Sequence, residues 1–144
     1  MQVALKELDM EKFTLVDDIK VFCETAKSFP DGIIKAHREL ESIITCSKLR
    51  RYFGVLGPNE KGVIVYNAAA EEIYQGEAEE LGCETFIIES GQYVYLLVED
   101  YRSDLTAIVK AFQLLKASPG VDSQGYDIVR YLNDKDARCM LRLV

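Results

Sequence analysis

Ile33–Leu40 reads IIKAHREL, and Ile108–Leu115, which begins 75 residues later, reads IVKAFQLL. Four of the eight aligned positions are identical, and a fifth exchanges isoleucine for valine. In both stretches the apolar residues recur at the spacing of one helix face, which predicts an amphipathic helix in each. The helix pair therefore indicates an internal repeat at an offset of 75.

The same offset also aligns the segments on either side of these helices. The strand-like segment Tyr52–Leu56 falls on Asp127–Tyr131. Upstream, Ile19, Val21 and Cys23 fall on Val94, Leu96 and Val98, and all six are of an inward-facing type. Two unrelated amphipathic helices would match by chance only over the helix itself. We therefore interpret the alignment as a duplication.

Each copy is predicted to run strand, helix, strand, strand, and a weakly alternating Val3–Leu8 is predicted to form an additional first strand. We expect an α+β fold with pseudo-two-fold symmetry, in which an antiparallel sheet carries two helices. Residues 1–144 would form one domain, built of modules at about 1–75 and 84–144. An acidic connection over 71–84 would join them, and their seam is a natural place for a ligand groove.

The net charge and the hydropathy of the sequence exclude several classes of function. The formal net charge of −7 argues against direct binding to nucleic acid or to an anionic membrane. The longest uncharged stretches, Gly62–Ala70 and Ser90–Val98, are too short for a membrane helix. The first twelve residues lack the apolar core of a signal peptide, so we expect a cytoplasmic protein.

No metal site, cofactor or catalytic residue is predicted. The cysteines Cys23, Cys46, Cys83 and Cys139 are scattered and form no paired ligand motif, and the only histidine is His37. His37 falls on Phe112 in the repeat, which favours an ordinary helix residue over the base of a nucleophile pair.

Three short motifs resemble the GyrI-like domains, also called the AraC-type effector-binding domain. They are Gly91-Gln92-Tyr93, Tyr52–Val55 together with Tyr66, and Gly125-Tyr126 followed by Tyr131–Asp134. The resemblance covers residues 3–144. It implies a tandem strand–helix–strand–strand fold and a bacterial domain that binds small molecules, in many members as part of a transcription regulator. No DNA-binding segment is evident here, so we expect the effector-binding part alone.

The resemblance also implies a binding carboxylate, which this chain lacks at the matching position. Several family members contact cationic, aromatic ligands with a Glu that corresponds to Val129 here, and some hydrolases of the family use a Trp, which this chain does not contain. Asp127 lies on the same strand face as Val129 and Tyr131. It either supplies the carboxylate or is a solvated residue at the start of its strand.

The predicted ligand site is an aromatic groove at the seam, because tyrosine offers a flat apolar face with a polar tip. On strand alternation Tyr93 and Tyr95 share a face with Glu99, which is either a groove wall or an ordinary solvent-facing strand. Our predicted ligand-binding residues are Tyr52, Tyr66, Tyr93, Tyr95, Glu99, Asp127 and Tyr131.

The sequence favours a non-enzymatic protein that binds neutral or cationic organic molecules. Two alternatives stay open: a hydrolase with Glu99 or Asp127 as its acid–base group, and a module that sequesters a basic protein partner, as the namesake of the family suggests. The protein is also a possible homodimer, whichever of these functions it has. The glutamates of residues 71–80 are predicted to form a solvated connection. Arg50 and Arg51 are predicted to face solvent.

Overall fold

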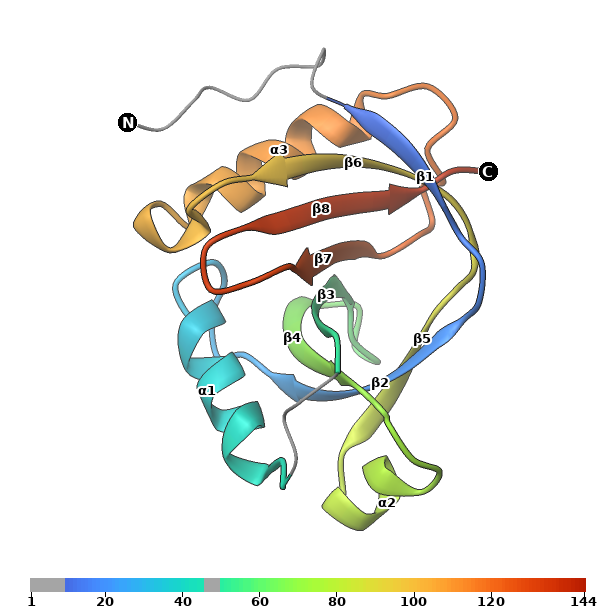
Figure 1. Ribbon diagram of the computed structural model, residues 1–144. Helices are drawn as coiled ribbons and strands as arrows, with labels where there is room; N and C mark the ends of the chain where they lie inside the picture. Colours follow the sequence, from blue (N-terminus) through green and yellow to red (C-terminus); the bar gives the residue numbers. More distant parts are fainter. Residues whose placement is uncertain (1–9, 46–49) are drawn as a thin grey trace.

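The computed structural model describes residues 10–45 and 50–144 (Figure 1). The predicted strand Val3–Leu8 and Cys46 lie outside the described residues. The strands are β1 Glu11–Leu15, β2 Ile19–Thr25, β3 Tyr52–Pro58, β4 Ile64–Glu71, β5 Glu84–Ile88, β6 Gly91–Val98, β7 Asp127–Tyr131 and β8 Ala137–Arg142. The helices are α1 Ile33–Ile43, α2 Glu77–Leu81 and α3 Thr106–Lys116, and η2 is a 3-10 turn at Tyr101–Ser103. None of the described helices is long and apolar enough to span a membrane.

The fold is α+β, with one antiparallel sheet of eight strands and a duplicated β-α-β-β module. We call β2-α1-β3-β4 the first module and β6-α3-β7-β8 the second. The strand order is β1-β6-β8-β7-β3-β4-β2-β5, which reads the same from either end when the modules are exchanged. The structure adds α2, a third helix, to the two that the repeat predicts.

The strand that precedes each module pairs with the other module. β1 comes before β2 in the chain but pairs with β6, and β5 comes before β6 but pairs with β2. The modules also pair directly through β3 and β7 in the middle of the sheet. Three strand pairs therefore join the two halves of the chain.

The helices α1 and α3 pack on the same face of this sheet. Ile33, Ala36 and Leu40 of α1 are buried there, as are Ile108, Ala111 and Leu115 of α3, in one apolar cluster with alternate residues of the strands. These two sets are related by the predicted offset of 75. The repeat of helix faces is therefore confirmed.

The predicted alignment of β2 with β6 is wrong. Ile19 and Val21 are buried on the face away from the helices, whereas Val94, Leu96 and Val98 lie in the helix-side cluster. The helix-side residue of β2 is Phe22, which pairs with Ala70 of β4. Successive side chains along a strand point to opposite faces. An alignment offset that is wrong by an odd number of residues therefore assigns every side chain of the strand to the wrong face.

The sheet is strongly curved, as the sweep of its edge strands shows (Figure 1). Phe86 of β5 contacts Tyr126, which directly precedes β7, with ring centroids 4.8 Å apart. In a flat sheet these strands would be ~19 Å apart at the usual spacing, because four strand steps separate them. The curvature closes the second face around its own apolar cluster, which includes Phe53, Ile88 and Met140.

Candidate functional site

The seam between the modules is the β3–β7 strand pair. Gly54 pairs with Val129 at its centre, and these two residues are related by the offset of 75. Tyr52 pairs with Tyr131 toward one end of the seam, and Leu56 pairs with Asp127 at the other. All of these side chains belong to the helix-covered face, by alternation with Phe53 and Ile128 on the opposite face.

At one end of the seam three polar side chains form a hydrogen-bonded chain. The hydroxyls of Tyr66 and Tyr131 are 2.5 Å apart, and Nε2 of His37 lies 2.8 Å from the Tyr66 hydroxyl. The Tyr66 ring lies over Gly54, where a Cβ atom would come within 2.2 Å of the Tyr66 hydroxyl oxygen. The glycine therefore allows a strand of the first module to place its tyrosine against Tyr131 of the second.

The three hydrogen-bonded side chains, His37, Tyr66 and Tyr131, are uncharged. Burial lowers the pKa of His37 to about 4, and the positive charge of Arg102 lowers it further. Burial likewise raises the pKa of Tyr66, and the neighbouring Tyr131 contributes to that rise. Burial also raises the pKa of Tyr131. A neutral imidazole with two phenols satisfies its own hydrogen bonds without an ion.

Aromatic rings pack around these hydrogen-bonded side chains. Phe29 stacks on Tyr66 with ring centroids 5.3 Å apart, and Tyr101 packs against Tyr131 at 5.0 Å. Tyr66 is 1% exposed and Tyr101 5% exposed, so this end of the seam is filled by the protein's own rings. It holds the modules together. Its partly exposed members are Phe29, His37, Tyr52 and Tyr131.

The other end of the seam opens into a cavity of about 530 Å³. Both modules line it. The first contributes Leu56, Gly57, Pro58 and Ile64, and the second contributes Lys116, most of the loop 118–125, Asp127 and Leu141. The volume lies in the range of small-molecule sites, ~300–1,000 Å³.

Asp127 is the buried charged group of this cavity. It is 7% exposed, and Nζ of Lys116, a lysine whose side chain is 61% exposed, lies 3.2 Å from Oδ2 of Asp127. Burial raises the pKa of Asp127, against the opposing effect of Lys116. A carboxylate in this environment can bind a cationic group, or a hydrogen-bond donor, that takes the place of the exposed lysine tip.

The structure separates the seven predicted residues into distinct places. Tyr52, Tyr66 and Tyr131 lie together at the closed end of the seam, and Asp127 lies in the cavity at the other end. Tyr93 and Tyr95 are on the opposite face of the sheet, where Tyr93 is 2% exposed and donates a hydrogen bond to the Glu89 carbonyl. Glu99 is exposed beyond the end of β6.

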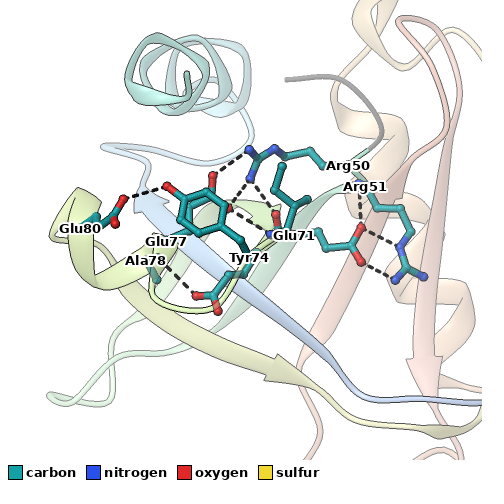
Figure 2. Close-up of polar contacts among 9 residues, drawn as sticks. Arg50, Arg51, Glu71, Tyr74, Glu77, Ala78 and Glu80 are labelled. Carbon is teal, nitrogen blue, oxygen red and sulfur yellow. Dashed lines mark hydrogen bonds and ion pairs between the residues drawn. The ribbon is translucent and has the colours of Figure 1, made fainter. Parts of the chain in front are cut away.

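The acidic connection is solvated only in part: Glu79 and Glu80 are exposed, as its composition predicts, but one of its glutamates is buried. Glu77, in α2, is buried with Arg50, and their side chains are 2% and 0% exposed. Both Nη atoms of Arg50 donate to the Glu77 carboxylate at 2.8 Å, and Glu77 also accepts from the Ile73 amide (Figure 2). Arg51 forms a second two-point pair with Glu71 (Figure 2). The prediction that Arg50 faces solvent is therefore wrong.

Sequence reasoning missed the parts of these sites that depend on packing. His37 gave no signal, because a histidine on a helix face has the same spacing whether it meets solvent or a tyrosine. The Arg50–Glu77 pair joins residues 27 positions apart. In the sequence, a basic pair comes before the strand β3 and an acidic run follows the strand β4. The same pattern is typical of two solvent-exposed segments, so it does not predict a buried ion pair.

No family model matches the sequence, and no curated protein matches it. Solved structures do match its fold. Integron cassette protein VCH_CASS2 from the mobile metagenome of Vibrio cholerae superposes with a TM-score of 0.67 at 10% identity, covering 94% of this chain and 96% of that one. A hydrolase from Listeria innocua gives 0.60 at 12% identity, covering 94% and 92%. A candidate transcription regulation protein from Staphylococcus aureus MU50 gives 0.54 at 10% identity, covering 92% and 96%. At these identities the likeness shows a shared fold.

Proposed function

We propose that this protein is an effector-binding domain of the GyrI-like kind, which binds a small organic molecule in the cavity beside Asp127. The duplicated β-α-β-β fold and its likeness to a candidate transcription regulation protein support the family assignment. The observation that carries the function is Asp127 itself, a buried carboxylate in a cavity built by both modules.

The cavity indicates the chemistry of the ligand. Leu56, Ile64, Val121 and Leu141 offer apolar walls. Two carboxylates line the cavity as well, the buried Asp127 and the partly exposed Asp122. The charge partner of Asp127 is a single lysine at the end of α3 whose side chain is exposed, so a cationic ligand group can take its place and keep the buried carboxylate paired. The preferred ligand is therefore an apolar or aromatic molecule with one amine, amidine or hydroxyl group.

A panel of such molecules, measured by thermal shift and calorimetry, tests the proposal. Asp127→Asn keeps the size of the side chain and removes its charge, so binding of cationic ligands should weaken at least tenfold. Asp134→Asn, at an exposed position outside the cavity, is the matched control. Equal ligand affinity in Asp127→Asn and the unsubstituted protein would contradict the assignment of the site.

The same residue favours a second candidate function, hydrolysis. A buried carboxylate with a raised pKa is suited to general acid–base catalysis, and a fold neighbour is named as a hydrolase. The two functions differ in turnover. A hydrolase would convert a small electrophilic ester or epoxide catalytically and lose that activity in Asp127→Asn, whereas a binding domain would release its ligand unchanged.

A further inference from the structure

Three arginines gather on the face of the sheet away from α1 and α3. Arg130 of β7 is directly opposite Arg138 of β8 in the strand register, and Phe53 of β3 is opposite Arg130 on its other side. Arg51 precedes Phe53 by two positions, so it faces the same way. We call Arg51, Arg130 and Arg138 the arginine cluster.

The cluster is costly to the folded protein. Like charges directly opposite each other on neighbouring strands are destabilising. Burial lowers the pKa of Arg130, and the positive charges of Arg138 and Arg51 lower it further. Its guanidinium nevertheless stays protonated at neutral pH. Moreover, Nε of Arg130 is buried and has no hydrogen-bond partner in the described part of the chain.

The nearby carboxylates neutralise the cluster only in part. Glu71 pairs with Arg51, and its charge raises the pKa of Arg130, against the effect of the other arginines. Arg51 donates to the two Glu71 carboxylate oxygens at 3.1 and 2.6 Å (Figure 2). Glu11 accepts a hydrogen bond from the Tyr95 hydroxyl, and the Arg138 guanidinium lies over the Tyr95 ring, 4.8 Å from its centroid. Within the described ranges neither Arg130 nor Arg138 has a carboxylate in an ion pair.

We propose that Arg130 and Arg138 bind the phosphate or carboxylate group of a small molecule, with the Tyr95 ring as an adjoining surface. Guanidinium groups bind such oxyanions through paired hydrogen bonds. An oxyanion between the two arginines would also remove the repulsion between them. The site lies on the other face of the sheet from the cavity of Asp127, so it is independent of the proposed function.

Anion-dependent stabilisation tests this site. Inorganic phosphate and succinate are titrated separately into the protein, at an ionic strength held constant with sodium chloride, and the unfolding midpoint is recorded. A bound oxyanion at ten times its dissociation constant should raise the midpoint by about 4 °C. A response to phosphate alone indicates a phosphorylated ligand, and a response to succinate alone indicates a carboxylate.

Variants of the cluster separate binding from a general salt effect. Arg130→Gln and Arg138→Gln should each lose the stabilisation by phosphate or succinate. Arg38→Gln, at an exposed position on α1, should keep it. The proposal would be overturned if the midpoint responds no more to either oxyanion than to chloride, or if both cluster variants respond as strongly as the unsubstituted protein.

The ligand-free protein provides a second measurement. Arg130→Leu removes the repulsion and the unpaired Nε, so its midpoint without added anion should be higher by about 3 °C. A gain in stability together with a loss of anion response is the behaviour of a binding residue. A lower midpoint in Arg130→Leu would show that Arg130 stabilises the fold, and would contradict the site.

Discussion

At the scale of single residues, Gly54 decides how the two modules meet. Its missing side chain makes room for the Tyr66 ring, which reaches Tyr131 across the seam and is held by His37. Gly54 lies inside a regular strand, so the backbone conformation does not require a glycine there; the space that the Tyr66 ring occupies does. The Tyr66 hydroxyl can reach Tyr131 across the seam only because this one position carries no Cβ.

Gly54→Ala should therefore destabilise the protein by about 1–3 kcal/mol, the range of overpacked cores. The added methyl group would displace the Tyr66 ring and break its hydrogen bonds to His37 and Tyr131. Urea denaturation measures the change. Gly125→Ala is the control, because its nearest contact would be an ordinary 3.4 Å, and we expect it within about 0.5 kcal/mol of the unsubstituted protein. Equal losses in the two variants would contradict this account of Gly54.

At the scale of elements, the short helix α2 is held by one buried ion pair. A helix of five residues has little stability of its own. Glu77 attaches it to Arg50, and Arg50 also donates to the Glu71 carbonyl at the end of β4. The connection between the modules therefore has a defined path from β4 to β5.

Removing one partner of this pair should be costly, because it leaves the other charge buried. We expect Glu77→Gln to lose about 3 kcal/mol of unfolding free energy in urea. The double variant Arg50→Met/Glu77→Leu should recover most of that loss, since it leaves no buried charge. Glu79→Gln, on the exposed side of α2, should leave the midpoint unchanged. A double variant as unstable as Glu77→Gln would refute the explanation by an unpaired charge.

The same pair predicts a loss of stability in acid. Hydrogen bonds from Arg50 lower the pKa of Glu77 from its model-compound value of 4.5, and those from Arg51 lower the pKa of Glu71. Below about pH 4.5 the unfolded chain takes up protons that the folded protein does not, so stability falls as the pH falls. Asp127, whose pKa is raised, acts in the opposite direction. Denaturation between pH 3 and 7 should show a steeper acid loss in the unsubstituted protein than in Glu77→Gln; parallel pH profiles would exclude this role of the pair.

At the scale of the whole molecule, the duplication does not produce two independent units. β1 and β5 each complete the sheet of the module that does not follow them in the chain, and β3 pairs with β7 between the modules. We propose that residues 1–144 fold as one cooperative domain. Each half by itself would expose unpaired strand edges.

Fragments 1–75 and 76–144, produced separately, should accordingly lack stable tertiary structure. Mixed at equal concentration, they should regain the circular dichroism and the dispersed amide spectrum of the intact chain. The full-length protein, cleaved between residues 75 and 76 after it has folded, is the reference for the mixed fragments. A cooperative unfolding transition in either isolated fragment would contradict the single-domain proposal.

Much of this protein follows from its sequence. Local periodicity determines the helices and most strands, and the repeat of helix faces determines that the fold is duplicated. The repeat also predicts that Tyr52 and Asp127 line the seam and that Tyr66 lies on a neighbouring strand, and the strand pairing agrees. Their role in ligand binding stays a prediction. These features depend on the order of residues along one element, and a single element carries that information.

Tertiary structure decided the rest. Which face β2 buries, where Tyr93 and Tyr95 point, and whether Glu77 meets water depend on strand register and on partners far away in the chain. A shift of one residue reverses a strand's faces, and a charge is buried only where its partner arrives. The arginine cluster likewise exists only because β7 and β8 pair Arg130 with Arg138. Sequence pattern determines what an element can bury, and packing decides what it meets.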